Sequence, residues 1–514
     1  MARIALLAAT FVAGVAAMSA SHAQGSDSAE ARTRAALAKI EQLNPRLNAV
    51  IAVDPTALAQ ARSLDRQRHA RGPLFGMPVL IKDNIESAGP LPTTAGSLAL
   101  TANVTNRDAP LVAGLRAAGA VILGKTNLSE WANIRSNDSI SGWSAVGGQV
   151  RNPYALNRNP CGSSSGSGAA VAAGMVPAAI GTETDGSITC PAALNGIVGF
   201  KPTVGFVSRT HVVPISHSQD TPGPMTLTVR DAALVMNAIS GTDPADPATA
   251  EADRRRVDFT AGLRADALRG ARIGVMRFAG APGTEAAFEA ALAMLRAQGA
   301  TLVDIAEAPA GRQEMGRAEF AVLLAELKVD LNAYLATVPA AVRSRTLADL
   351  IAFNREHAST EMALFGQEVF EQAERTTGLD EAYRTARATS LRLAGPEGID
   401  KMLRDHNVVA LVAPTRPAAW LIDAVHGDQS PGGGSAGSLA AVAGYPHLTV
   451  PMGRVRGLPV GISFIGTKWD DARILALGYA YEQASHQRFA PSFYPSIEES
   501  PDVAPHLRPA PRRP

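Results

Sequence analysis

Apolar residues along this chain fall into short unbroken runs, separated by longer stretches in which they recur at helical spacing. The unbroken runs are rich in Val, Ile and Leu, a pattern typical of strands that are buried on both faces of a sheet. They predict strands within residues 75–85, 120–127, 271–278, 300–305, 408–415, 447–453 and 458–466.

Helical periodicity fills much of the sequence between these runs. Residues 284–298 place Phe288, Leu292 and Leu295 on one helix face. Strands that alternate with helices predict an α/β fold, with a mixed central β-sheet covered by helices on both faces. Residues 306–406 have a mainly helical pattern, and we interpret them as a helical insertion that caps the sheet.

The N-terminus has the layout of a secretory signal peptide, which we assign to residues 1–23. Arg3 precedes an alanine-rich apolar run that ends near Met18, and the small residues Ser21 and Ala23 stand where a signal peptidase needs them. An uncleaved membrane anchor is the alternative, but the run is short for a bilayer span. We therefore expect a periplasmic or secreted protein that does not contact the membrane once the signal is removed.

The rest of the chain is predicted to form a single domain over residues 24–500. Its first helix is expected from about Ala31 to Leu43, with Pro45 ending it. Residues 501–514 are rich in proline, and we expect them to be a disordered tail.

Composition and charge exclude some classes of partner. With 46% apolar and 18% charged residues, a chain of 514 residues can bury a large core. Loss of Arg3 with the signal peptide reduces the formal net charge from +1 to 0. No overall positive field then favours nucleic acid or an anionic membrane, and we expect neither as a partner.

Residues 160–174, PCGSSSGSGAAVAAG, are a cluster of serine and glycine. A flexible linker is disfavoured because the cluster passes directly into a small-residue helix, and a Walker phosphate loop because no Gly-Lys-Ser/Thr follows. Residues 162–166 match the G-x-S-x-G nucleophile elbow, with Ser164 as the nucleophile. That elbow must follow a strand, however, and the preceding RNPYALNRNP contains two prolines and no apolar run.

Two other segments carry candidate catalytic chemistry. Ser187 follows the turn Thr184-Asp185-Gly186, whose backbone N–H groups can converge and hold an oxyanion beside a hydroxyl. Lys82 ends the apolar run VLIK, where burial would lower the pKa of its ammonium and make it a base for a serine. A lone lysine at a strand end is more often structural, and so this interpretation depends on the neighbouring motifs.

In their order and spacing, the motifs of this chain resemble those of the amidase signature family. Weaker similarity extends to about residue 466, and the serine-rich segments are most similar to those of bacterial peptide amidases. The matching segments are GMPVLIKDNI (76–85), GKTNLSEWA (124–132), CGSSSGSGAA (161–170), GTETDGSI (181–188), GFKPT (199–203) and SQDTPGPM (218–225).

The resemblance implies the amidase signature fold and a relay of three residues. Ser187 aligns with the family's nucleophile, Lys82 with its lysine, and Ser163 with the serine, held on a cis peptide, that bridges them. Neutral Lys82 would take a proton from Ser163 while Ser163 takes one from Ser187, which attacks the amide carbon. Backbone N–H groups around Thr184, Asp185 and Gly186 would hold the oxyanion, and neither a metal nor a cofactor is expected.

We therefore expect a serine hydrolase that converts the C-terminal carboxamide of peptide amides to the free acid and ammonia. Aryl, fatty and other small amides are alternative substrates, because substrate choice is expected to lie in residues 306–406 and 430–438. A glutamine-hydrolysing transamidosome subunit is a further alternative, disfavoured by the signal peptide and the lack of a basic patch. We expect a monomer or homodimer whose partner is a small-molecule or peptide amide.

Residues around these motifs carry secondary expectations. Most of the family has glycine where Asp185 stands, and its carboxylate would brace the turn or, alternatively, recognise a substrate N–H. Cys161 and Cys190 flank the two serines, and we expect two packed thiols, with a disulfide as the alternative.

Four further residues, Arg158, Asp220, His217 and Tyr445, are expected to lie around the site. Asp220 is expected to pair with Arg158, and His217 and Tyr445 are candidates for the pocket wall.

Overall fold

The structure, a computed structural model, describes residues 28–67, 72–432 and 436–507. The expected signal peptide lies outside these residues. The strands are β1 (Val50–Val53), β2 (Pro78–Lys82), β3 (Val121–Thr126), β4 (Trp143–Ser144), β5 (Gly148–Gln149), β6 (Ala178–Glu183), β7 (Val198–Lys201), β8 (Thr221–Thr226), β9 (Arg272–Met276), β10 (Thr301–Ile305), β11 (Ala410–Pro414), β12 (His447–Val455) and β13 (Leu458–Ile465).

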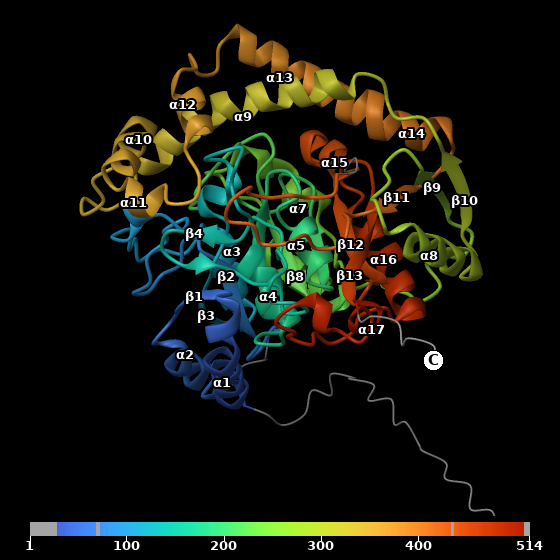
Figure 1. The fold of residues 1–514 in the computed structure, drawn as a ribbon, viewed down its shortest axis with the longest axis horizontal. Helices are drawn as coiled ribbons and strands as arrows, with labels where there is room; N and C mark the ends of the chain where they lie inside the picture. Colours follow the sequence, from blue (N-terminus) through green and yellow to red (C-terminus); the bar gives the residue numbers. More distant parts are fainter. Residues whose placement is uncertain (1–27, 68–71, 433–435, 508–514) are drawn as a thin grey trace, which may run out of the picture.

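Within the described residues, eleven of these strands form one mixed sheet in the order β1-β3-β2-β6-β8-β7-β12-β13-β11-β9-β10 (Figure 1). Strands β3, β2 and β6 run parallel, as do β11, β9 and β10, and the pairs between these two groups are antiparallel. Strands β4 and β5 form a separate ladder. The expected mixed central sheet is therefore confirmed.

Helices cover both faces of this sheet. In chain order they are α1 (Ala29–Leu47), α2 (Ala57–Asp65), α3 (Pro110–Ala117), α4 (Ser165–Ala172), α5 (Thr189–Leu194), α6 (Val229–Ile239), α7 (Ala252–Arg255), α8 (Glu285–Ala297), α9 (Arg312–Leu335), α10 (Leu347–Glu356), α11 (Ala358–Glu361), α12 (Glu368–Glu374), α13 (Glu381–Ala394), α14 (Asp400–Asp405), α15 (Gly437–Ala443), α16 (Asp471–Ser485) and α17 (Ala504–Leu507).

Alternate residues of the central strands divide between two cores. Val79 and Ile81 of β2 belong to a core with side chains of α3, α6, α8 and α16, whereas Leu80 belongs to a second core with α1, α2 and α4. Successive side chains of a strand point to opposite faces, and both faces are covered here. This is the reason that the strands appear in the sequence as unbroken apolar runs rather than as alternating ones.

All seven predicted strands form, but the sequence did not predict β1, β6, β7 and β8 of the main sheet or the short strands β4 and β5. Strand β8 contains Pro222 and Pro224, residues that normally argue against a central strand. It pairs with β6 along its whole length but with β7 only at Val198↔Thr226 and Gly199↔Met225. Pro222 and Pro224 therefore lie beyond the part of β8 that pairs with β7, and their lack of an N–H group removes no hydrogen bond from that ladder.

Residues 312–405 are mainly helical. Helices α9 and α13 pack against each other and form an arch along one side of the molecule (Figure 1). The side chains of α9 reach the loops at the end of the central strands, as described below.

The ends of the described chain differ from the predicted boundaries. Helix α1 continues through Pro45 to Leu47, because the following backbone still closes the last turn, with Asn48 N–H donating to Asn44 O at 2.8 Å. At the other end, Ala504–Leu507 form α17 within the segment predicted to be disordered, and residues 508–514 lie outside the described part. Across the described residues, no helix combines the length and apolar character needed to cross a membrane.

Cys161 and Cys190 form a disulfide, and the expectation of two free thiols was wrong. Their Cα atoms are 6.0 Å apart, within the range that a disulfide spans. The sequence shows only that they are 29 residues apart, whereas their proximity comes from the packing of the segment before α4 against α5. The bond closes a loop that contains all of α4 and β6.

This loop gives a stability prediction for the double variant Cys161→Ser/Cys190→Ser. A loop of this length removes about 3–4 kcal/mol of conformational freedom from the unfolded chain, and so the variant should unfold a few degrees lower than the wild type. Differential scanning calorimetry measures the shift. A reducing agent should produce it in the wild type and leave the variant unchanged; equal unfolding temperatures with and without the bond would contradict the prediction.

Candidate active site

The parallel pairing of β2 and β6 brings the candidate residues to one edge of the sheet. Ile81 of β2 lies opposite Ile180 of β6, and so both strands end at the same edge. Lys82 is the last residue of β2, and Ser187 lies in the loop between β6 and α5. In open α/β sheets, ligands bind at the carboxyl ends of such strands.

Lys82 is fully buried beneath this edge. Its Nζ donates to Ser163 Oγ at 2.7 Å, to Thr182 Oγ1 at 2.8 Å and to the Thr182 carbonyl at 3.3 Å. Burial lowers the pKa of Lys82 to about 7, against the opposing effect of the Asp220 and Glu183 carboxylates. The structure thus brings Lys82 and Ser163 together, with the lysine close to its neutral form at physiological pH.

The three consecutive serines, Ser163, Ser164 and Ser165, occupy different environments. The peptide bond between Gly162 and Ser163 is cis, as the family resemblance implied. Ser164 Oγ donates to the Thr182 carbonyl and accepts from Thr182 N–H, both at 3.1 Å, and Ser165 Oγ donates to the Cys161 carbonyl at 2.6 Å. Because Ser164 is buried and bonded to the backbone of β6, the elbow alternative finds no support in the structure.

Ser187 lies at the surface of the site in a turn that Glu183 fixes. One oxygen of the Glu183 carboxylate accepts from the N–H groups of Ile188 at 2.8 Å and Thr189 at 2.9 Å. Gly186 has a φ of +80°, a conformation that side chains rarely adopt. Within the described residues, the N–H groups of Asp185, Gly186 and Ser187 make no hydrogen bond.

Asp220 holds the other side of this turn. Its carboxylate accepts from Thr184 Oγ1 at 2.6 Å and from the N–H groups of Ile215 and Ser216 at 2.8 and 2.9 Å. The expected pair with Arg158 does not form, since Arg158 instead contacts Glu498 at 3.2 Å. The hydrogen-bond donors of Asp220 are instead the Thr184 hydroxyl and two backbone N–H groups, all nearer to it in sequence than Arg158.

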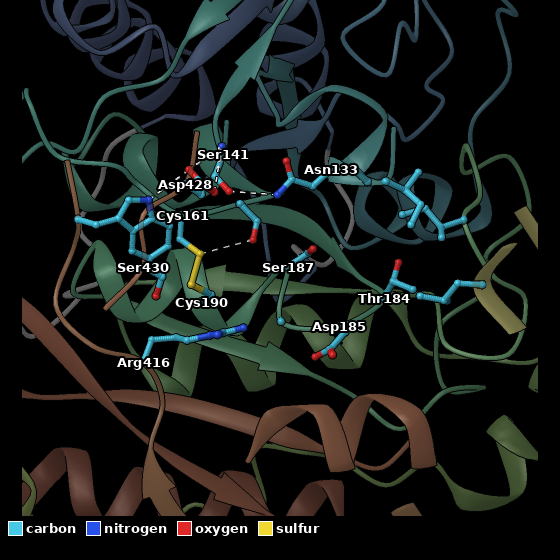
Figure 2. Close-up of a pocket in the computed structure, with 17 residues that line it drawn as sticks. Asn133, Ser141, Cys161, Thr184, Asp185, Ser187, Cys190, Arg416, Asp428 and Ser430 are labelled. Carbon is cyan, nitrogen blue, oxygen red and sulfur yellow. Dashed lines mark hydrogen bonds between the residues drawn. A yellow bond between two sulfur atoms is a disulfide. The ribbon is translucent and has the colours of Figure 1, made fainter. Parts of the chain in front are cut away.

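A pocket opens above Ser187 (Figure 2). Four sequence-predicted residues line it: Thr184, Asp185, Gly186 and Ser187. Lys82 and Ser163 are not in its wall; they lie beneath it in the buried layer. Ser430 also lines the pocket and belongs to the 430–438 segment that the sequence linked to substrate choice, whereas the sequence missed the other polar residues of the wall, Asn133, Ser141, Arg416 and Asp428.

The missed residues come from distant parts of the chain. Arg416 follows β11 by two residues, and Leu323 of α9 adds an apolar contribution to the wall. A polar residue just after an apolar strand is the same signal that identified Lys82, and it could have identified Arg416. The other residues lie in irregular loops, where no periodic pattern marks them.

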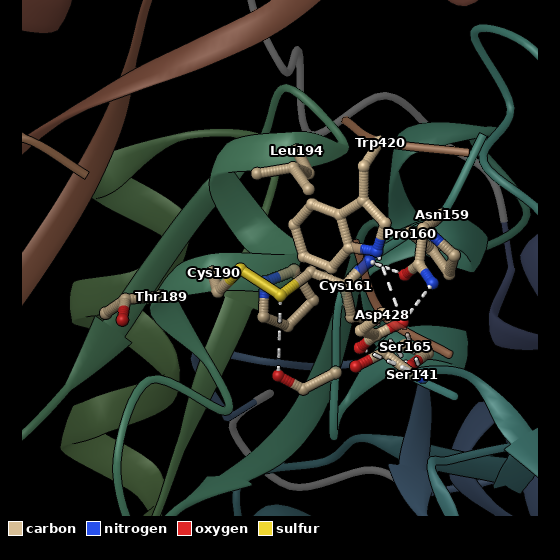
Figure 3. Close-up of a disulfide and its surroundings, with 12 residues drawn as sticks. Ser141, Asn159, Pro160, Cys161, Ser165, Thr189, Cys190, Leu194, Trp420 and Asp428 are labelled. Carbon is tan, nitrogen blue, oxygen red and sulfur yellow. Dashed lines mark hydrogen bonds between the residues drawn. A yellow bond between two sulfur atoms is a disulfide. The ribbon is translucent and has the colours of Figure 1, made fainter. Parts of the chain in front are cut away.

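The disulfide and Trp420 form one wall of the pocket (Figure 3). Asp428 accepts from the Trp420 indole N–H at 3.2 Å, from Asn159 Nδ2 at 2.9 Å and from Ser141 N–H at 3.1 Å. Burial raises the pKa of Asp428. Three loops are therefore joined through one carboxylate at the edge of the site.

His217 and Tyr445, the two other candidates, do not line the pocket. His217 Nδ1 lies 2.9 Å from Asp330, and Tyr445 OH donates to Asp400 at 2.7 Å. Within the described residues, His217, Glu326 and Asp330 are the one group whose ligand atoms lie close enough to hold a metal ion. Both Glu326 oxygens already accept hydrogen bonds from Ser216, Ser218 and Tyr383, which favours an ion-pair cluster that attaches α9 to the loop before β8.

Comparisons with known proteins find relatives that match most of the chain. The Amidase family model matches residues 31–475. The crystal structure of the native peptide amidase from Stenotrophomonas maltophilia is 51% identical, with a TM-score of 0.85 over 91% of this chain and 96% of that one. A structure of peptide amidase in complex with the competitive inhibitor chymostatin is 52% identical, with a TM-score of 0.86 and the same coverage of both chains.

A probable amidase of Arabidopsis thaliana is 41% identical over 473 residues, which cover 89% of this chain and 87% of the relative. The family match spans most of the chain, and the sheet, the buried lysine and the serine loops all lie within it. The chain therefore belongs to the amidase signature family and is an amidase, a hydrolase of amide bonds.

Proposed function

We propose that this amidase hydrolyses the C-terminal carboxamide of peptide amides, with Ser187 as nucleophile and Ser163 and Lys82 as a proton relay. The contact of 2.7 Å between Lys82 Nζ and Ser163 Oγ, beneath a pocket that contains Ser187, is the observation that carries the proposal. Ser164 N–H donates to the Ser187 carbonyl at 3.1 Å, which ties the two serine segments together.

In this relay, each residue moves one proton. Neutral Lys82 accepts the hydroxyl proton of Ser163, and Ser163 accepts that of Ser187 as its oxygen attacks the carboxamide carbon. The protons then return along the same path to the departing nitrogen, which leaves as ammonia. Water hydrolyses the acyl-enzyme by the same steps and releases the free acid.

The turn before the nucleophile supplies the oxyanion site. The N–H groups of Asp185, Gly186 and Ser187 are unpaired within the part of the chain that the structure describes, and all three residues line the pocket. Preorganised N–H donors of this kind stabilise the negative oxygen of a tetrahedral intermediate. Glu183 and Asp220 hold the turn at its two ends, which keeps these donors in place.

The proposed substrate class rests on the lining of the pocket and on the similarity of the chain to a peptide amidase. The pocket is open and lined by both polar and apolar side chains, as a peptide end with a polar backbone requires. The similar peptide amidase binds chymostatin. Anilides and fatty amides remain the alternative substrates, and release of ammonia from a dipeptide amide, compared with turnover of those amides, distinguishes them.

Substitution of the relay residues tests the mechanism. Ser187→Ala removes the nucleophile, and Lys82→Met keeps the buried volume but removes the base; each should reduce kcat/KM on the order of 10³-fold or more. Ammonia release from a dipeptide amide is the measurement. Lys401→Ala, which removes an exposed lysine, should retain wild-type activity, and activity that survives in Ser187→Ala would show that another residue is the nucleophile.

The pH dependence follows from the pKa of Lys82, which lies at about 7. Only the neutral amine can accept a proton, and so kcat/KM should fall about tenfold for each pH unit below about 7 and level off above it. An N-acetylated dipeptide amide without ionisable groups is the suitable substrate. Circular dichroism at each pH checks that the protein stays folded, and a rate that is constant from pH 5 to 8 would exclude Lys82 as the base.

A further inference from the structure

Asp185 carries a buried carboxylate oxygen that the proposed relay does not use. Its Oδ1 is shielded from solvent and, among the described residues, has no hydrogen-bond partner. The Ser438 hydroxyl of α15 interacts with the carboxylate. Leaving a charged oxygen buried and unpaired is costly, and so a ligand that supplies a donor at this point would be bound favourably.

Arg416 approaches the same point from the other side. Figure 2 shows the Asp185 and Arg416 side chains reaching toward each other next to Ser187. Arg416 Nη2 lies 3.4 Å from the position that a Cβ on Gly186 would occupy, which places the guanidinium against the turn before the nucleophile. No ion pair within 4 Å joins Arg416 to a carboxylate in the described ranges, and its donors remain available to the pocket.

Glu319 of α9 affects the charge of this pair. Burial, and then the Asp185 carboxylate, raises the pKa of Glu319; burial also raises the pKa of Asp185, but Arg416 lowers it. Two nearby buried carboxyl groups do not both ionise easily. Of these two carboxyl groups, Asp185 is the one whose charged form Arg416 favours.

We propose that Asp185 and Arg416 form a subsite for the peptide group on the acyl side of the scissile carboxamide. Asp185 Oδ1 accepts the N–H of the residue that carries the carboxamide, and Arg416 donates to the preceding carbonyl oxygen. This inference rests on the proposed function and narrows its substrates to N-acylated, and hence peptide, amides.

The arrangement disfavours two other kinds of substrate. A free α-ammonium group is attracted by Asp185 but repelled by Arg416, whereas a peptide group matches both ends of the pair. An alkyl or aryl amide without the N–H leaves Asp185 Oδ1 buried and unpaired, and sites of this type discriminate strongly against such analogues. The position of Asp185, two residues before Ser187, suits an N–H that is separated from the attacked carbon by a single Cα.

An isosteric pair of substrates tests the contact directly. N-acetyl-leucinamide contains the N–H, and its depsipeptide analogue has an ester oxygen in its place. In the wild type, kcat/KM for ammonia release should be about 10- to 100-fold higher for the N–H substrate. A ratio near one in the wild type overturns the proposal without any variant.

The variant Asp185→Ala separates recognition from bracing of the turn. If Asp185 accepts the substrate N–H, the ratio between the two substrates should shrink to about threefold or less, because the variant loses activity mainly on N-acetyl-leucinamide. If Asp185 only braces the turn, both substrates lose activity by the same factor and the ratio is unchanged, which contradicts the proposal. Asp185→Asn keeps an acceptor oxygen and should retain an intermediate ratio.

Arg416→Gln supplies an independent readout. The wild type should prefer N-acetyl-leucinamide to leucinamide with a free amine, and loss of the positive charge should narrow that preference at least about tenfold. If Arg416→Gln prefers N-acetyl-leucinamide to leucinamide as strongly as the wild type does, Arg416 is not part of the subsite. If no peptide amide releases ammonia at all, the proposed function is wrong. If N-acetyl-leucinamide is hydrolysed but the substrate ratios are the same in the variants as in the wild type, the proposed function stands and only the proposed subsite is wrong.

Discussion

The site depends on the burial of one ammonium group. Removing a charged lysine from water is strongly disfavoured. A lysine in a protein interior therefore has hydrogen-bond partners for its nitrogen, or is neutral. Lys82 meets both conditions, because Thr182 and Ser163 surround its nitrogen and burial brings its pKa to about 7. The parallel pairing of β2 with β6 is what makes this possible, since it places Thr182 beside the lysine.

Two carboxylates near the lysine, Glu183 and Asp220, also hold the loops of the site in place. Glu183 and Asp220 both favour the protonated lysine, yet burial dominates and its pKa still falls. Each carboxylate is also bonded to backbone N–H groups, Glu183 at the start of α5 and Asp220 in the loop before β8. The same two groups therefore fix the turn around Ser187, and the lysine remains close to neutral because burial outweighs their attraction for its charged form.

The sequence predicted those strands and site residues that a local pattern of neighbouring residues marks. The seven predicted strands are built around Val, Ile and Leu, whereas β6 and β8 consist largely of Gly, Ala, Thr and Pro and β7 has only four residues. The burial of β6, β7 and β8 follows from their central position in the sheet rather than from their own propensity. Lys82, Ser163 and Ser187 could be proposed from the sequence because each lies in a dense local motif.

The pocket wall and the long-range pairings could not be predicted in this way. Trp420, Asp428 and Ser141 meet only because distant loops converge, and neither the Cys161–Cys190 bond nor the contact of Arg158 with Glu498 has a local signal.

The proposed relay and much of the pocket wall come from different parts of the chain. The lysine, both serines and the turn of N–H donors lie between residues 82 and 187: Lys82 ends β2, Ser163 lies in the segment before α4, and the turn with Ser187 lies between β6 and α5. Much of the opposite wall comes from later segments: Leu323 of α9, Arg416 after β11, and the loop with Asp428. Substitutions in these segments can change the pocket without moving the relay. Asp185 is the exception, because it belongs to the turn before Ser187 and also interacts with Glu319 of α9 and Ser438 of α15. In the proposed mechanism it is therefore the residue at which reaction and recognition are coupled.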